Sequence, residues 1–183
     1  LLLVGAGLLL RSFWTVLRVE PGFRIEGVLT AAIDPPPSRY GDQDARRRYY
    51  EEVQQEIAGL PGVQEAGFVS RAPLQSVSNG LLQLRGGPAE DISADYQIAS
   101  EGYFRALGIT LVRGRLFTDA DHSNAPHVAV VNESFAREAW PDLDPIGRQV
   151  SSGGMEDSTR WATVVGVDAD VRQDGLTPAA RPA

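Results

Sequence analysis

Cysteine and lysine are both absent from this sequence of 183 residues, and histidine occurs only twice. Without cysteine the chain has no disulfide framework, no thiol nucleophile and no thiolate ligand for a metal. Without lysine it cannot contain the G-x-x-x-x-G-K-[ST] phosphate loop, because that motif uses a lysine to bind nucleotide phosphates. ATP hydrolysis by a loop of this kind is therefore excluded within this chain.

Positive charge is also scarce, since all 17 basic residues are arginine and they are outnumbered by 24 acidic residues. The formal net charge is -7. Binding to nucleic acid depends on basic side chains that neutralise phosphates, so we expect no nucleic-acid partner. The composition, 43% hydrophobic and 22% charged, is ordinary for a folded chain, and the length suits one large domain or two small ones.

A short apolar run, LLLVGAGLLL, occupies residues 1–10. A helix needs about 20 apolar residues to cross a bilayer, but the sequence begins inside the run and without methionine. We interpret residues 1–23 as the end of a transmembrane helix and a coupling segment, Arg18 to Phe23, with Pro21-Gly22 as its hinge or elbow. Phe13 and Trp14 suit the aromatic belt at a membrane interface. A signal-peptide core and a buried soluble helix are the alternatives.

The first third of the remaining chain has a strand–helix–strand pattern. Residues 28–33 are a strand candidate, Asp42 can cap a helix that ends near Gly59, and residues 63–69 form the next strand candidate. This order predicts a βαβ unit with parallel strands. The apolar stripe of the helix, at spacings of three or four, consists of Ala45, Tyr49, Val53, Ile57 and Leu60.

A triple arginine, Arg46 to Arg48, lies on the same helix and could bind an anion. The favoured interpretation is a solvated face on which these arginines pair with Glu51 and Glu52 at helical spacing.

The central stretch, residues 95–150, alternates short helices and strands. Residues 81–85 and 93–99 are strand candidates that precede a helix over residues 101–108, which glycine closes. A strand over residues 128–131 leads to Asn132, which can cap a second helix, and Gly147 turns the chain into a further strand. The apolar side of the second helix carries Phe135, Ala136, Ala139 and Trp140.

The longest β-branched run covers residues 161–171 and is typical of a strand that is buried on both faces. We predict that it pairs beside residues 28–33 and 63–69. The expected fold class is α+β, with a discontinuous βαβ subdomain that carries an inserted small mixed α/β subdomain. The predicted parts are residues 1–23 as membrane helix end and coupling segment, 24–74 plus 161–176 as the first subdomain, 75–160 as the inserted one, and 177–183 as a tail.

A polar cluster, Asp119, Asp121, His122, Ser123 and Asn124, invites comparison with a calcium loop. An EF-hand that starts at Asp119 needs glycine at its sixth position and glutamate at its twelfth, where this chain has Asn124 and Val130. We reject the motif and interpret the cluster as a solvated turn.

The two histidines, His122 and His127, lack cysteine or glutamate partners at zinc spacing. A Ser-His-Asp triad is a spatial arrangement that the sequence leaves open, but no serine lies in a G-x-S-x-G turn. We assign no catalytic, cofactor-binding or metal residues and no cofactor. The aromatic residues that could form either core or partner surface are Tyr103, Phe104, Phe117 and Trp140; we favour core for Phe104 and Trp140 and leave Phe117 open.

Three consecutive runs carry a family resemblance: YFRALGITLVRGRLFTDAD, VAVVNESFAREAWP and DPIGRQV. With their flanks, LLLVGAGLLLRSFWTVLRVEPGF and VVGVDADVRQDGL, they resemble the extracytoplasmic core domain of MacB-type ABC transporter permeases. The closest variety is the duplicated orphan permease group described from acidobacteria. The resemblance covers nearly the whole chain in order.

The resemblance implies a non-enzymatic domain on the periplasmic side of the bacterial inner membrane, where it transmits ATP-driven conformational change for export or efflux. In this family the βαβ subdomain is the porter-like part. The implied partners are an ABC ATPase subunit or domain, a second permease half as a homodimer or internal duplicate, and a periplasmic adaptor.

One observation opposes the membrane topology that the resemblance implies. Arg11, Arg18 and Arg24, just beyond the apolar run, favour a cytoplasmic side by the positive-inside rule, opposite to the resemblance. The alternative function is a membrane-anchored extracytoplasmic ligand-binding or sensor domain without ATPase coupling.

Overall fold

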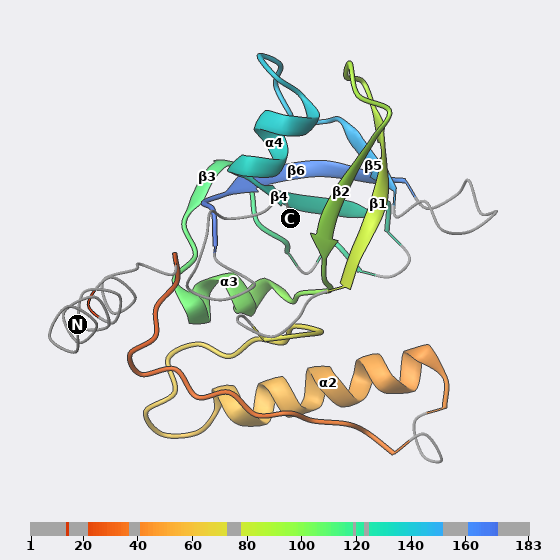
Figure 1. Cartoon of the computed structure of the whole chain (residues 1–183). Helices are drawn as coiled ribbons and strands as arrows, with labels where there is room; N and C mark the ends of the chain where they lie inside the picture. Colours follow the sequence, from red (N-terminus) through yellow and green to blue (C-terminus); the bar gives the residue numbers. More distant parts are fainter. Residues whose placement is uncertain are drawn as a thin grey trace, which may run out of the picture.

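The computed structural model describes residue 14 and residues 22–36, 41–72, 78–118, 120–122, 125–151 and 161–171. Its helices are α2 (Gln43–Ala58), α3 (Glu101–Leu107) and α4 (Glu133–Ala139). Its strands are β1 (Ser78–Arg85), β2 (Asp91–Tyr96), β3 (Leu111–Gly114), β4 (Val128–Asn132), β5 (Gln149–Ser151) and β6 (Ala162–Asp168). Figure 1 shows α4 and the sheet at one end of the molecule and α2 at the other, with α3 between them.

The six strands form one mixed sheet in the order β2-β1-β5-β6-β3, with β4 also paired to β6. Strands β4 and β6 are parallel, and the remaining pairs are antiparallel. One edge of β6 is occupied by β4 from Thr163 to Asp168, while β5 and β3 share the other edge. Both edges of β6 are therefore filled within this sheet.

The main core lies between this sheet and α4. Asn132 accepts a hydrogen bond from the backbone N–H of Phe135 at 2.8 Å and so begins the helix, as predicted. The helix then buries Phe135, Ala139 and Trp140 against Val164 of β6 and the inward side chains of β1 and β2. Each large side chain that is removed from water in this way stabilises the fold by about 1.5–3 kcal/mol.

A second, smaller core surrounds α3. Its buried members are Tyr103, Phe104, Leu107, Ile109 and Val171, and they pack with partly buried side chains from several segments. The partly buried contributors are Phe23, Val28, Val69, Ala99, Leu116, Phe117 and Val130. This cluster therefore joins the first described residues of the domain to the last ones.

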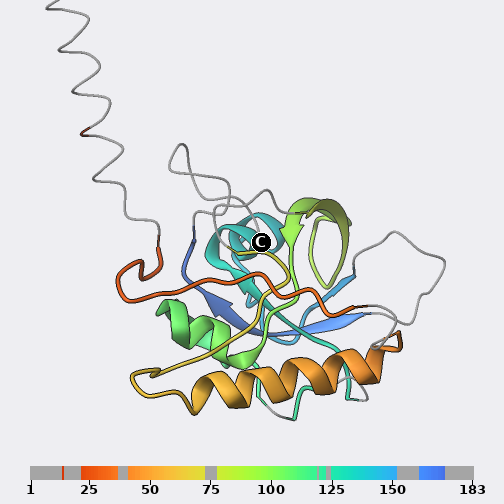
Figure 2. The same cartoon turned by 90° about the horizontal axis from the view of Figure 1, so that it is seen from below.

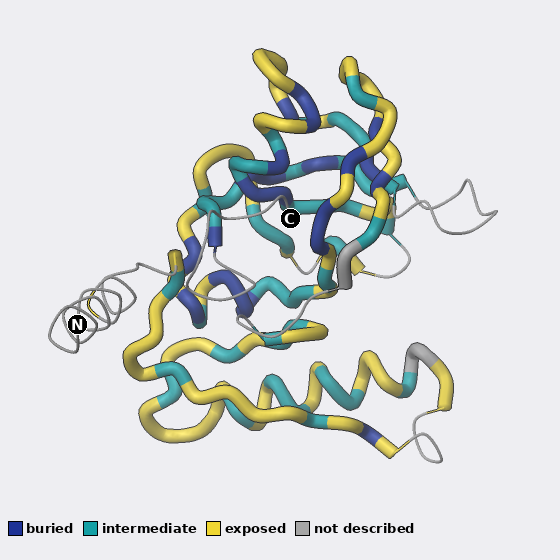
Figure 3. The backbone as a smooth tube through the Cα atoms, in the orientation of Figure 1, coloured by how far each residue is buried: buried dark blue, intermediate teal, exposed yellow. Residues whose placement is uncertain are grey.

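Helix α2 begins and ends where the sequence predicts. The side chain of Asp42 accepts a hydrogen bond from the N–H of Ala45 at 2.7 Å, and Gly59 follows the last helical residue. Arg47 pairs with Glu51 at 2.9 Å on its solvated face. In the predicted apolar stripe, Ala45, Tyr49, Val53 and Ile57 are half-buried but Leu60 is exposed, and Figure 3 shows no fully buried position among the described side chains of the helix.

The segment over residues 22–36, called here the leading segment, runs beside α2 as extended chain (Figure 2). The predicted strand over residues 28–33 is wrong, because these residues form no strand and Leu29 is 95% exposed. The predicted strand over residues 63–69 is also wrong, apart from one isolated antiparallel bridge between Val69 and Ala99. The expected βαβ unit is thus not formed among the described residues.

The β-branched run at the end of the chain does form a strand, β6, but its predicted pairing is wrong. It pairs with β3, β4 and β5, and these leave no free edge for residues 28–33 or 63–69. Only Val171, beyond the end of β6, reaches the small core that contains Val28 and Val69. The short strand β3 was not predicted.

Of the residues predicted as the end of a membrane helix and its coupling segment, 1–13 and 15–21 lie outside the described part, and so does the predicted tail over residues 177–183. In the part of the chain that the structure describes, no helix combines the length and the apolar character needed to span a bilayer.

Candidate functional site

The junction between the leading segment and the rest of the domain is the candidate site, and Gly22 is its tightest contact. A β-carbon on Gly22 would lie 2.4 Å from the carbonyl oxygen of Asp170 and 3.2 Å from the Cα of Val171. The φ angle of Gly22 is also positive, at 84°. Both features require glycine, because a side chain would collide with the backbone and would strain this conformation.

The next residues of the leading segment attach to the end of α3. The N–H of Arg24 donates a hydrogen bond to the carbonyl of Leu107 at 2.6 Å. Gly108 closes the helix, as the sequence predicts, and adopts the left-handed conformation. Its own N–H donates to the backbone carbonyls of Arg105 and Phe104. Arg24 thus satisfies a carbonyl at the helix end that would otherwise lack a partner.

Apolar contact completes the junction, since Phe23 packs in the same cluster as Leu107 and Val171. The predicted coupling segment, Arg18 to Phe23, is described only at Gly22 and Phe23, and residues 18–21 lie outside the described part. Gly22 lies against the backbone of Asp170 and Val171 just beyond β6, Phe23 packs in the cluster around α3, and Arg24 adds the backbone hydrogen bond, so the leading segment is attached at several points.

A second glycine contact attaches α2 and the chain that follows it to α3. A β-carbon on Gly67 would lie 2.2 Å from the nitrogen of Tyr103, and one on Gly102 would lie 2.0 Å from the carbonyl oxygen of Ala66. The N–H of Phe68 donates to the hydroxyl of Ser100 at 2.8 Å. The two segments are therefore in direct backbone contact.

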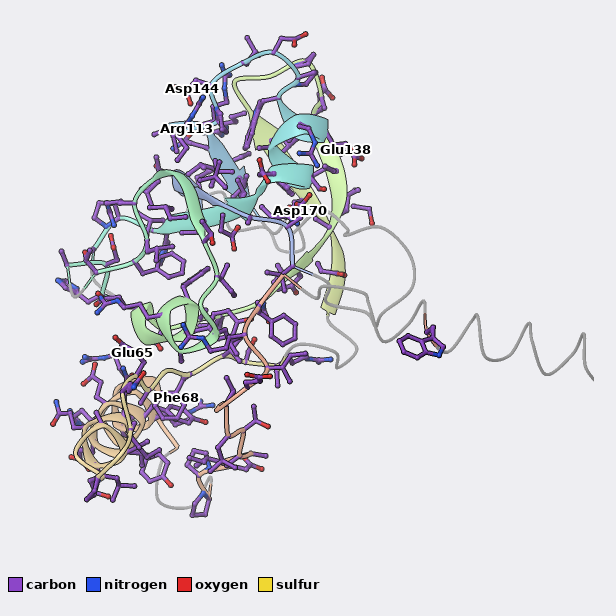
Figure 4. All side chains as sticks on the ribbon, turned by 90° about the vertical axis from the view of Figure 1, so that its left-hand side faces the viewer. Glu65, Phe68, Arg113, Glu138, Asp144 and Asp170 are labelled. Carbon is purple, nitrogen blue, oxygen red and sulfur yellow. The ribbon has the colours of Figure 1, made fainter. Side chains whose placement is uncertain are left out.

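Side chains of α2 reinforce this contact. The amide of Gln54 donates to the carbonyl of Ala66 at 3.1 Å, and the ring of Tyr50 meets that of Phe68 edge-on at 5.2 Å between centroids. Figure 4 shows Glu65 and Phe68 beside α2. Helix α2 is thereby linked to α3 through residues 66–68.

The polar cluster that resembled a calcium loop contains an ion pair. Arg115 donates to both carboxylate oxygens of Asp121, at 2.6 Å and 2.9 Å, and Thr118 donates to the same carboxylate from its N–H and its hydroxyl. The hydrogen bond from Arg115 and those from Thr118 lower the pKa of Asp121 to about 2. The other cluster members, Asp119, Ser123 and Asn124, lie outside the described residues.

The two histidines contribute their backbone carbonyls to the described fold. The backbone carbonyl of His122 accepts from Ala125, and that of His127 accepts from Thr163, so both carbonyls serve the fold. Across the described ranges, no three His, Cys, Asp or Glu side chains are grouped so that they could hold a metal ion.

The aromatic candidates are core residues. Tyr103, Phe104 and Trp140 are buried, and the half-buried Phe117 packs edge-on against Phe104 with 5.7 Å between ring centroids. The structure thus decides the position of Phe117, which the sequence left open.

An acidic group that the sequence analysis did not identify lies where β4 and β6 end. Burial raises the pKa of Asp168 to about 7, and the nearby charges of Asp170 and Glu133 raise it further. A signal was present in the sequence, since Asn132-Glu133 and Asp168-Ala169-Asp170 each follow a β-branched run. Parallel strands end at the same edge, but the pairing of these two runs was not predicted.

Comparison with known proteins gives partial matches to one group. The chain is 27% identical over 88 residues to the macrolide export ATP-binding/permease protein MacB of Neisseria gonorrhoeae and, equally, of Neisseria meningitidis. The aligned region is 48% of this chain but only 13% of each relative, so the chain spans a small part of their length.

Two solved structures align with part of the chain. The periplasmic region of MacB from Actinobacillus actinomycetemcomitans aligns with 61% of this chain and 56% of its own, at 24% identity and a TM-score of 0.43. The extracellular domain of the transporter YknZ from Gram-positive bacteria aligns with 72% of this chain and 58% of its own, at 20% identity and a TM-score of 0.45.

The family model described as the MacB-like periplasmic core domain matches residues 13–180, which is nearly the whole chain. This match agrees with the resemblance of the three central runs and with an α+β fold built on one sheet. The chain belongs to the family of MacB-like periplasmic core domains.

Proposed function

We propose that this domain is the periplasmic part of an ABC-type permease that passes ATP-driven movement of membrane helices to export or efflux. The observation that carries the proposal is the attachment of the leading segment by backbone contacts at two places: Gly22 lies against Asp170 just beyond β6, and Arg24 binds the end of α3. A segment attached at two points cannot pivot freely, so displacement of the preceding chain moves the domain as a body.

The proposed partners follow from the family. They are an ABC ATPase subunit or domain, a second permease half that is either an identical copy or an internal duplicate, and a periplasmic adaptor. The proposed location is the inner membrane of a bacterium, with this domain on the periplasmic side and residues 1–23 as the end of a membrane helix and its coupling segment. The runs quoted above support the finer assignment to the duplicated orphan permeases.

We also propose a division into a subdomain of residues 24–74 plus 161–176 and an inserted subdomain of residues 75–160. The clustering of Val28, Val69 and Val171 supports the first subdomain. The pairing of β6 differs from this division for residues 162–168, because β6 pairs with β3, β4 and β5, which all belong to the inserted subdomain.

The testing experiment loosens the junction in the full-length protein. Four residues of glycine and serine are inserted between Glu20 and Pro21, and substrate export and ATP hydrolysis are measured in vesicles with the cognate ATPase. A flexible insert cannot transmit force, so export falls at least about tenfold while ATP hydrolysis continues. The matched control places the same insert after Pro61, in an exposed turn that follows α2.

Unchanged export with the insert after Glu20 would contradict mechanical transmission and favour the anchored ligand-binding alternative.

The side of the membrane on which the domain lies is tested separately. A Glu52→Cys variant places a thiol at an exposed position of α2; these 183 residues contain no cysteine, and any cysteine elsewhere in the full-length protein is replaced first. Labelling of intact cells by a membrane-impermeant maleimide is expected, whereas labelling only after lysis would place the domain in the cytoplasm.

A further inference from the structure

Asp170 lies between the leading segment and α4 and contacts both. Its backbone faces Gly22, where a β-carbon would come within 2.4 Å of its carbonyl oxygen. Its side chain faces the first turn of α4, since Oδ1 accepts from the N–H of Ser134 at 2.8 Å and Oδ2 accepts from the hydroxyl of Ser134 at 2.6 Å. Figure 4 labels Asp170 at this position beyond β6.

Arg137 closes the arrangement on the solvent side. It donates to Oδ2 of Asp170 at 3.0 Å and to the hydroxyl of Ser134 at 2.9 Å. The side chain of Arg137 is 65% exposed, against 25% for Asp170. Because exposed ion pairs contribute little, the two hydrogen bonds from Ser134 are the stronger part of this link.

We propose that Asp170 is a coupling residue, through which displacement of the leading segment at Gly22 changes the position of α4, and that the coupling acts in both directions. The proposal rests on the proposed function, because it identifies the path that movement takes into the domain. Coupling between two sites is reciprocal by thermodynamic necessity, so a disturbance of α4 must also reach the leading segment.

The geometry favours transmission at this residue. The contact at Gly22 is between backbones, so no change of side-chain rotamer can absorb a shift of the leading segment. The N–H of Ala169 is bound to the carbonyl of Thr110 at 2.9 Å, which holds the adjacent residue to the chain before β3. A shift at Gly22 therefore displaces Asp170, and Asp170 carries the hydrogen bonds that fix Ser134.

The experiment is hydrogen–deuterium exchange at residue level on the full-length protein, without nucleotide. In Gly22→Ala, the added methyl group pushes on Asp170, and we expect the N–H of Ser134 to exchange about tenfold faster or more. Gly27→Ala is the matched control, because Gly27 also has a positive φ, of 73°, but has nothing within 4 Å of its β-carbon position. This control should leave the exchange of Ser134 unchanged.

The reciprocal variant is Ser134→Ala, which removes one hydroxyl from a partly exposed position. We expect faster exchange at the N–H of Arg24, which is bound to Leu107 and lies outside α4. The N–H of Val164, bound to the carbonyl of Arg148 within the main core, reports global unfolding and should stay protected in every variant. If Gly22→Ala also raises the exchange at Val164, that variant unfolds globally. The exchange at Arg24 in Ser134→Ala then tests the coupling.

The proposal is overturned if Gly22→Ala leaves Ser134 protected, or if Ser134→Ala changes exchange only within α4. The readout is independent of transport. Coupling between Gly22 and Ser134 together with unchanged export in the linker variant would keep this proposal and refute the proposed function. Loss of export without such coupling would keep the function and refute the path through Asp170.

Discussion

The backbone of Gly67 lies directly against that of Gly102, and a β-carbon on Gly67 would fall 2.4 Å from the carbonyl carbon of Gly102. No side chain of either residue separates the two segments. The chain after α2 and the first turn of α3 can approach this closely only because both residues are glycine.

Alanine at Gly67 or at Gly102 should destabilise the domain by about 1–3 kcal/mol, because the methyl group is forced into backbone atoms that cannot turn aside. Gly59→Ala is the matched control, since its nearest atom beyond the β-carbon position is at 3.5 Å. Urea unfolding followed by circular dichroism measures the free energy of unfolding. Equal stability of Gly67→Ala and Gly59→Ala would contradict the contact.

The turn between β1 and β2 rests on Trp140, and a β-carbon on Gly87 would lie 2.3 Å from Cδ1 of that ring. We expect Gly87→Ala to reduce the free energy of unfolding by about 1–3 kcal/mol. Gly80→Ala should cost less, because its nearest neighbour is the end of the Tyr96 side chain at 3.1 Å.

A double-mutant cycle tests the assignment of that cost to the indole. In a Trp140→Leu background, the smaller side chain leaves room, so Gly87→Ala should cost less than half of its value in the native background. Additive costs would show that the collision involves other atoms than the ring.

The raised pKa of Asp168 predicts that the free energy of unfolding decreases as pH rises. Its pKa is about 7 in the folded protein, against about 3.9 in an unfolded chain, so the folded state binds the extra proton between these values. Stability should therefore be greatest near pH 4 and fall towards pH 7, as the buried carboxyl ionises beside Asp170 and Glu133.

The variant Asp168→Asn keeps the shape of the side chain and removes the charge. It should flatten this part of the stability profile and raise stability at pH 8, which thermal denaturation at several pH values would measure. An unchanged slope between pH 4 and pH 7 would show that another group is responsible.

The lowered pKa of Asp121 predicts the opposite pH dependence, in which the free energy of unfolding decreases as pH falls. Its pKa is lowered to about 2 by the hydrogen bonds from Arg115 and Thr118, so its contribution is complete above the unfolded value of about 3.9. That contribution is lost as pH falls towards 2. Asp121→Asn should remove the acid dependence between pH 4 and pH 2, as measured by urea unfolding, whereas Asp144→Asn, at an exposed carboxylate, should retain it.

The helices of the domain follow from local sequence. Asp42 and Asn132 begin α2 and α4 by hydrogen bonds to residues three positions away, and Gly108 ends α3 in a conformation that glycine adopts readily. These interactions span a few residues, so neighbouring letters of the sequence are sufficient to predict them. The burial of Phe135 and Trp140 followed from their spacing on the same helix.

The strands were predicted less well, because a strand exists only where another strand pairs with it. Residues 28–33 and 162–168 both have β-branched character, yet only the latter found partners on both edges. Which strands pair with the two edges of β6 depends on the whole topology. For the same reason, β3 was missed, since its four residues are mostly exposed and only its pairing with β6 defines it.

The sequence by itself determined the family, the helices with their capping residues, and the absence of thiol and phosphate-loop chemistry. The tertiary structure alone decided that Gly22 meets Asp170, that Asp170 binds Ser134, and that Gly67 meets Gly102. Each pair is far apart in the chain and consists of residue types that are common in turns. Only the packing of β6, α3 and the leading segment brings them together, because contact between backbones leaves no pattern in the sequence except the glycine itself.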